Sequence, residues 1–320
     1  MAGNTNIWLN GIMGVVAGDA LGCPVQFETR EEVARHPVEG MRGYGTFNLP
    51  AGSWTDDSSL TLALAESIRR KQAIDLDDIM ENFMKWLYEG QFTPYGEAFD
   101  IGRGTMQAID RYRAGLGADR CGGREEWNNG NGSLMRILPA CIYCSLQISR
   151  GKMSDQDAVR TIHAVGSLTH AHIRSNIACG LYFFMAQQIL AGNGSLSDRL
   201  QEGMTRGFAF YEDFLPGTED LHYYDRLRDL AVLSSHSADL IKSSGYVVDS
   251  LEAAVWSLVT TDRFDDALQR AVNLGEDTDT VGAIAGGLGG LYYGCSALPE
   301  DWLFAIKRRE WIEELCRVEL

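Results

Sequence analysis

Two short segments of the chain concentrate side-chain oxygens. Residues 54–59 read WTDDSS, and residues 275–280 read GEDTDT. Each segment stands directly before an apolar stretch that is predicted to be helical. Carboxylates and hydroxyls at a helix start can cap free amides and interact favourably with the helix dipole. Capping needs only one or two such residues, so several in a row point to a second role, although capping remains the alternative for either segment alone.

Oxygen-only clusters of this kind suit hard divalent cations. Two adjacent aspartates such as Asp56 and Asp57 repel each other and lose solvation when buried, unless a cation offsets their charge. Asp277 and Asp279 are two positions apart, so a regular helix would direct them about 200° apart. A turn at Gly275 could bring both onto one site. If the two clusters meet, they favour magnesium or manganese over zinc.

Helical periodicity predicts the elements that must position these clusters. In residues 263–274, apolar side chains recur three and four positions apart and form one helical face. The same pattern occurs in residues 60–70, 178–190 and 246–261. Convincing alternating strands are absent, so we expect an all-α fold of about twelve or more helices in a single domain spanning residues 1–320. Two glycine-rich polar stretches are predicted to be loops, residues 40–53 and 115–132.

Net charge and the length of the apolar runs argue against two classes of partner, nucleic acids and membranes. The formal net charge of −16 lacks the basic footprint of a nucleic-acid-binding protein, so nucleic acid is not an expected partner. The apolar runs, such as residues 281–293, are shorter than the roughly 20 residues of a membrane span, and the N-terminus has no basic leader segment. We therefore expect no membrane partner.

Cysteine and glycine patterns favour packing over chemistry. The seven cysteines are odd in number and widely spaced, which indicates free thiols in a reducing cytoplasm. Cys141 and Cys144 form a lone C-x-x-C in an apolar stretch, which favours buried thiols over a zinc site. The glycine-rich stretch 282–294 lacks the lysine and hydroxyl of a phosphate loop. Its small residues instead predict a helix that packs closely against its neighbours.

Five segments, in this order along the chain, resemble the signatures of the ADP-ribosylglycohydrolases. They are GDALG at 18–22, WTDD at 54–57, DIGRGT at 100–105, NGNGSLMR at 129–136 and GEDTDT at 275–280. The resemblance spans about residues 11–295, nearly the whole chain. It implies a compact multi-helix domain of the ADP-ribosylglycohydrolase type, with a cleft that holds two Mg²⁺ or Mn²⁺ ions, in agreement with the helical periodicity.

The resemblance also implies roles for individual residues. The metal ligands would be Thr55, Asp56, Asp57, Asp277, Asp279 and Thr280. The ADP-ribose pocket would be lined by Gly102, Thr105, Asn129, Gly130, Asn131, Gly132, Ser133, Leu134, Met135 and His170. Glycines in this loop let backbone amides approach a pyrophosphate.

The acid–base residue is left open between two carboxylates. Asp100 is a candidate for proton transfer at the ribose. Many family members carry a glutamate seven positions after the first-motif aspartate, whereas this chain has Gln26 there. Glu28, two positions further on, could substitute or could lie on the surface. Asp19 itself is expected to be a structural hydrogen-bond acceptor at a helix end.

The function implied by the resemblance is metal-dependent removal of ADP-ribose from modified protein side chains. An ADP-ribosylated protein would be the substrate and ADP-ribose the product. The segment around Asp100 favours arginine linkage over serine linkage. Two alternatives stay open: a catalytically weak module that only binds ADP-ribose, and a generic two-metal phosphoester hydrolase. The complete set of metal ligands argues against the first, and loss of phosphate from a model ester would reveal the second.

Overall fold

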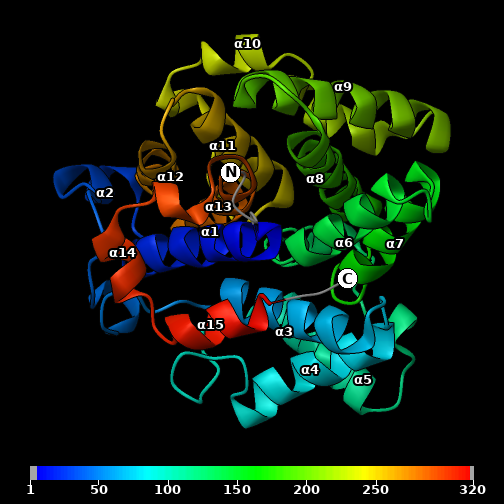
Figure 1. Ribbon diagram of the computed structural model, residues 1–320, viewed down its shortest axis with the longest axis horizontal. Coiled ribbons are helices and arrows are strands. Elements are labelled where there is room, and N and C mark those ends of the chain that lie inside the picture. The colour runs from blue at the N-terminus through cyan, green and yellow to red at the C-terminus, as the bar shows by residue number, and fades with distance from the viewer. Residues whose placement is uncertain (1–5, 318–320) are drawn as a thin grey trace.

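The computed structural model describes residues 6–317, which form helices and loops (Figure 1). Within this part of the chain, β-pairing is limited to three isolated bridges. The α-helices are α1 Ile7–Gly22, α2 Arg30–Arg35, α3 Asp56–Lys71, α4 Leu76–Glu89, α5 Arg103–Arg113, α6 Leu138–Ser149, α7 Asp155–Ser167, α8 Ile173–Ala191, α9 Leu196–Phe214, α10 Leu230–Ser234, α11 Val247–Val259, α12 Phe264–Val272, α13 Thr278–Tyr293, α14 Glu300–Ala305 and α15 Arg309–Leu315. The predicted all-α fold is confirmed.

Short 3₁₀ segments interrupt the loops between these helices. They are η1 Cys23–Val25, η2 Gly45–Phe47, η3 Ala118–Arg120, η4 Glu126–Asn128, η5 Glu219–Leu227, η6 Ala238–Leu240 and η7 Cys295–Ala297. The two predicted loops, 40–53 and 115–132, are irregular apart from η2, η3 and η4. The four helices predicted from periodicity are present as α3, α8, α11 and α12.

Helices α1 and α13 form the centre of the fold and pack with their backbones nearly in contact (Figure 1). A Cβ atom on Gly18 would lie 1.9 Å from the carbonyl oxygen of Gly282, and one on Gly14 would lie 2.1 Å from that of Gly286. Only glycine permits such an approach. The glycine-rich stretch is therefore a packing surface, as the sequence predicts.

We expect the Gly18→Ala substitution to destabilise the protein by about 3 kcal/mol or more, because a backbone carbonyl cannot move aside as a side chain can. Chemical unfolding in urea measures this change. The matched control is Gly117→Ala, where φ is −59° and the nearest atom to an added Cβ is the mobile carboxylate tip of Asp119. A Gly18→Ala midpoint equal to that of the control would contradict the close packing.

The first helix is more apolar than the sequence analysis allowed. Residues Ile7–Val25 are long and apolar enough to cross a membrane by length and composition alone, so the prediction that every apolar run is shorter than a membrane span is wrong for this segment. In the fold, 83% of this segment is buried, so its apolar side chains are packed against protein. The chain uses this helix as the core element against which α3 and α13 are set.

Candidate active site

The last turns of α1 anchor both oxygen-rich segments. The Asp19 carboxylate accepts hydrogen bonds from the backbone N–H groups of Thr55 and Ser58 at 3.0 Å, which fixes the start of α3. The Thr278 hydroxyl donates to the carbonyl oxygen of Gly22 at 2.8 Å, which fixes the start of α13. Asp19 is thus a structural acceptor, as predicted, and burial raises its pKa to about 7.

The two clusters meet at Asp57. Its Oδ2 atom accepts from the hydroxyls of Thr55 and Thr280, both at 3.3 Å, one from each cluster. The approach to α13 runs through two consecutive left-handed residues, Gly275 at φ 79° and Glu276 at φ 62°. A turn is therefore present at Gly275, where the sequence indicated that one could form, and it places Asp277 at the N-cap of α13.

Two carboxylate oxygens in this cluster are buried without a hydrogen-bond partner among the described residues. Asp57 and Asp279 are at most 1% exposed, and neither Asp57 Oδ1 nor Asp279 Oδ2 has a hydrogen-bond partner among the described residues. Burial, reinforced by the neighbouring carboxylates, raises the pKa values of Asp56, Asp57 and Asp279 well above their usual range. Anions buried in this way call for a cation.

The donor set fits magnesium or manganese by its chemistry, because all the predicted ligands are oxygens. Among residues 6–317, no three His, Cys, Asp or Glu side chains by themselves form a group that could hold a metal ion. The hydroxyls of Thr55 and Thr280, which already contact Asp57, would have to contribute.

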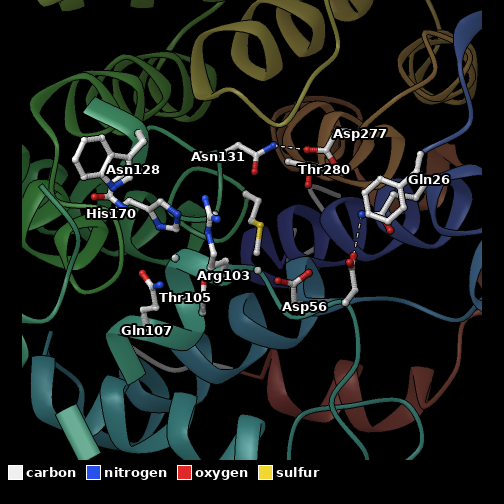
Figure 2. Close-up of a pocket in the computed structure, with 18 residues that line it drawn as sticks. Gln26, Asp56, Arg103, Thr105, Gln107, Asn128, Asn131, His170, Asp277 and Thr280 are labelled. Carbon is white, nitrogen blue, oxygen red and sulfur yellow. Dashed lines mark hydrogen bonds between the residues drawn. The ribbon is translucent and has the colours of Figure 1, made fainter. Parts of the chain in front are cut away.

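Asp100 stands beside the cluster in a left-handed backbone conformation, at φ 53°. Its Oδ2 atom accepts a hydrogen bond of 2.9 Å from the buried Gln26 side chain (Figure 2). Burial raises the pKa of Asp100, and the hydrogen bond from Gln26 partly opposes that rise. Gln26, at the position where the family resemblance led us to expect glutamate, therefore positions Asp100.

A cavity of about 550 Å³ opens above these side chains (Figure 2). Its lining includes these predicted residues: Asp56, Asp100, Gly102, Thr105, Gly130, Asn131, Gly132, Met135, His170, Asp277 and Thr280. Sequence reasoning missed others: Gln26, Phe27, Arg103, Gly104, Gln107, Trp127 and Asn128. Thr55, Asp57 and Asp279 lie behind the lining as part of the buried cluster.

Some predicted residues lie away from this cavity. Ser133 and Leu134 are buried and face the core, where Ser133 contacts the Cys179 thiol. Glu28 is not among the lining residues, and its carbonyl oxygen accepts from the Glu276 N–H at 2.7 Å. Glu28 does not line the cavity because the chain bends after η1, and this bend directs the side chains of Gln26 and Phe27 to the cavity instead.

Asn131 connects the predicted ligand-binding loop, residues 129–136, to the start of α13. The Nδ2 atom of Asn131 donates to Asp277 Oδ2 at 2.6 Å and to Ser250 Oγ at 2.9 Å (Figure 2). The loop therefore shares a carboxylate with the acidic cluster, which brings the predicted ligand-binding loop directly to the predicted metal site.

A second cavity of about 470 Å³ adjoins the first and shares Trp127 and Gly130 with it. Predicted residue Asn129 lines this second cavity, with Tyr246 and Arg174. Trp127 is 74% exposed. The only signal for it in the sequence is a large aromatic side chain in a polar, glycine-rich loop.

Arg174 organises the wall of the second cavity. Its guanidinium lies over the Tyr223 ring at 3.6 Å and forms ion pairs with Glu126 at 2.7 Å and Asp220 at 2.8 Å. Because Glu126 is in η4 next to Trp127, these contacts hold the loop that separates the two cavities.

Comparison with known proteins identifies relatives over the whole fold. The ADP-ribosylglycohydrolase family model matches residues 8–320. The chain is 32% identical to ADP-ribosylarginine hydrolase Tri1 from Serratia proteamaculans (strain 568), over 95% of this chain and 76% of that protein. It is 30% identical to ADP-ribosyl-[dinitrogen reductase] glycohydrolase from Rhodospirillum rubrum, over 92% and 88%. A solved structure described as an ADP-ribosylglycohydrolase-related protein complex is similar with a TM-score of 0.76 and 28% identity, over 97% and 95%.

An all-α fold with an acidic cleft, matched over nearly its full length by these proteins, defines an enzyme that hydrolyses the glycosidic bond of ADP-ribose. The chain belongs to the ADP-ribosylglycohydrolase family. The family and the fold class predicted from the five segments are both confirmed.

Proposed function

We propose that this enzyme removes ADP-ribose from arginine side chains of modified proteins and depends on two divalent cations. The observation that carries the proposal is the pair of buried, unpartnered oxygens, Asp57 Oδ1 and Asp279 Oδ2, behind a polar cavity that also contains Asp100. The names of two relatives support the linkage, since one acts on ADP-ribosylarginine and another on ADP-ribosyl-dinitrogen reductase.

Six side chains would hold the cations: Thr55, Asp56, Asp57, Asp277, Asp279 and Thr280. When bound, two Mg²⁺ or Mn²⁺ ions would neutralise the carboxylates, orient the vicinal ribose hydroxyls and activate a water molecule. Asn131, which donates to Asp277, would keep that carboxylate oriented.

The two adjoining cavities suit a ligand with two different ends. A ribose carrying the scissile bond fits the acidic end, near Asp56 and Asp100. A planar base fits the aromatic end, between Trp127 and Tyr246. Gly130, which lines both cavities, leaves room for a pyrophosphate to pass close to the backbone.

Bond cleavage builds positive charge on the ribose, which the surrounding carboxylates would stabilise electrostatically. The leaving guanidine of arginine needs a proton. We assign this proton to Asp100, and two observations support the assignment: burial raises the pKa of Asp100, and Gln26 holds one of its oxygens. The modified protein would dock at the mouth of the cavity, beside the exposed rings of Phe27 and Trp127.

We also propose a reducing cytoplasmic location. All seven cysteines are free in the structure, and six of them are buried. Free thiols of this number suit a reducing compartment.

The test is to incubate arginine-ADP-ribosylated and serine-ADP-ribosylated proteins separately with enzyme and Mg²⁺ or Mn²⁺, and to follow release of ADP-ribose. We expect release from arginine to exceed release from serine by at least about tenfold in kcat/KM. Faster release from serine would overturn the arginine assignment. Binding of ADP-ribose without release from any linkage would leave only a binding module. Phosphate loss from a model ester would favour the phosphoester hydrolase.

A further inference from the structure

A buried arginine lies beneath the cavity without a carboxylate partner. Arg136 is 0% exposed, and no ion pair to it occurs within residues 6–317. Its Nη2 atom donates to Thr169 Oγ1 at 2.8 Å, and its guanidinium lies 4.6 Å from the centre of the Phe83 ring. Burial lowers the pKa of Arg136 to about 10, so the group is still charged at neutral pH. The same Nη2 atom also donates to the carbonyl oxygen of Val165 at 3.4 Å, so the Thr169 hydroxyl is the closer of its two hydrogen-bond partners among the described residues and is the one side chain of the pair.

That hydroxyl links Arg136 to the cavity. Thr169 is 1% exposed, and its Oγ1 atom lies 2.9 Å from Nδ1 of His170. A guanidinium can only donate, so Thr169 Oγ1 accepts from Arg136 and keeps its own proton to donate. The acceptor available to it within the described hydrogen bonds is His170 Nδ1.

The direction of this hydrogen bond determines the protonation of His170. A neutral imidazole has one N–H group, and if Nδ1 accepts, the proton is on Nε2. The opposite tautomer would leave the buried Thr169 hydroxyl without an acceptor, at a free-energy cost. Burial and the charge of Arg136 lower the pKa of His170 to about 3, so the ring is neutral at physiological pH.

The Nε2 side of the ring faces the ligand cavity (Figure 2). Cβ atoms built on Gly104, Gly130 and Gly132 would lie 3.0, 3.5 and 3.3 Å from Nε2. The three glycines therefore leave space beside this nitrogen, which has no hydrogen-bond partner among the described residues. A donor directed into such a space suits an oxygen acceptor on a ligand.

We propose that Arg136 and Thr169 are positioning residues that fix His170 as a neutral N–H donor to an oxygen of the bound ligand. In this state His170 offers the ligand a proton donor and no lone pair, so it does not serve as the general base. The tautomer follows from the contacts of the protein alone. The identity of the ligand as ADP-ribose rests on the proposed function.

The test compares Thr169→Val, which removes the hydroxyl at nearly equal volume, with Thr169→Ser, which keeps it. Long-range ¹H–¹⁵N NMR spectra of ligand-free, ¹⁵N-histidine-labelled protein distinguish protonated from unprotonated ring nitrogens, and a His170→Gln variant assigns the signal. We expect protonated Nε2 and unprotonated Nδ1 in the parent protein and in Thr169→Ser. In Thr169→Val we expect a mixture of tautomers. Thermal unfolding checks that each variant is folded.

Calorimetric titration with ADP-ribose provides the second measurement. We expect roughly tenfold weaker binding for Thr169→Val and a change within about twofold for Thr169→Ser. A protonated Nδ1 in the parent, or the same tautomer in both variants, would overturn the proposal that Arg136 and Thr169 fix the tautomer of His170. If the spectra show the expected tautomers but Thr169→Val binds ADP-ribose as tightly as the parent, the role of His170 as a hydrogen-bond donor to the ligand is overturned. If the parent binds no ADP-ribose, the proposed function and the donor role both fail, while the spectra still decide the tautomer.

Discussion

Chelation of divalent cations is expected to abolish release of ADP-ribose, and addition of Mg²⁺ or Mn²⁺ to restore it. The physical reason is the buried cluster, in which Asp57 and Asp279 have oxygens without partners among the described residues, and burial, followed by the neighbouring carboxylates, raises their pKa values. A cation that binds only the folded state at about a hundredfold excess over its Kd stabilises it by about 2.7 kcal/mol. The melting temperature, measured with EDTA and with each metal, should therefore rise in parallel with activity.

An Asp279→Asn variant separates metal binding from helix capping. Asparagine can still accept the hydrogen bond of 2.9 Å that Asp279 Oδ1 receives from the Thr280 N–H, so a capping role would survive. Loss of a ligand charge should instead cost several orders of magnitude in kcat and remove the metal-dependent rise in melting temperature. The matched control is Asp198→Asn, which changes an exposed capping aspartate at the start of α9. Full activity of stripped enzyme in excess chelator, or an Asp279→Asn variant that behaves like the control, would refute the metal site.

Local patterns in the sequence were sufficient for the helices and for the two acidic clusters. The periodicity of residues 263–274 predicts α12, which buries one apolar face, and the apolar pattern of residues 246–261 predicts α11, which is buried over most of its surface. The suggestion of a turn at Gly275 also came from local geometry, since Asp277 and Asp279 would diverge on a regular helix. Such features depend on residues a few positions apart, and a single sequence contains that information.

Contacts between distant segments could not be predicted in the same way. Gln26 and Asp100 are 74 residues apart, and only the fold brings the amide to the carboxylate. The same is true of Trp127 and Tyr246, which line the second cavity together because the backbone of Gly130, three residues after Trp127, pairs with that of Tyr246. Glu28 illustrates the limit from the other direction. Its position shortly after the first family segment made Glu28 a candidate, but the chain bends after η1, so that Gln26 and Phe27 line the cavity and Glu28 does not.

Replacing Asp100 with asparagine is expected to lower turnover by about 10²- to 10⁴-fold while leaving ADP-ribose affinity nearly unchanged. Asparagine tolerates the left-handed backbone at this position, and its carbonyl oxygen can still accept from Gln26. The variant therefore loses the exchangeable proton and the charge without losing the local structure. Calorimetry with ADP-ribose and timed release from ADP-ribosylated arginine, carried out on both proteins, separate binding from catalysis.

Glu28→Gln is the matched control, because Glu28 lies outside the cavity lining and should tolerate the change with a rate close to that of the parent. If Asp100→Asn retains full turnover and Glu28→Gln loses it, proton transfer belongs to Glu28, and the segment after η1 must move when substrate binds. If both variants turn over normally, neither carboxylate transfers the proton. If Asp100→Asn loses affinity as strongly as turnover, Asp100 contributes to ligand binding and not to the chemical step alone, because a proton-transfer role lowers kcat and leaves the affinity for ADP-ribose intact.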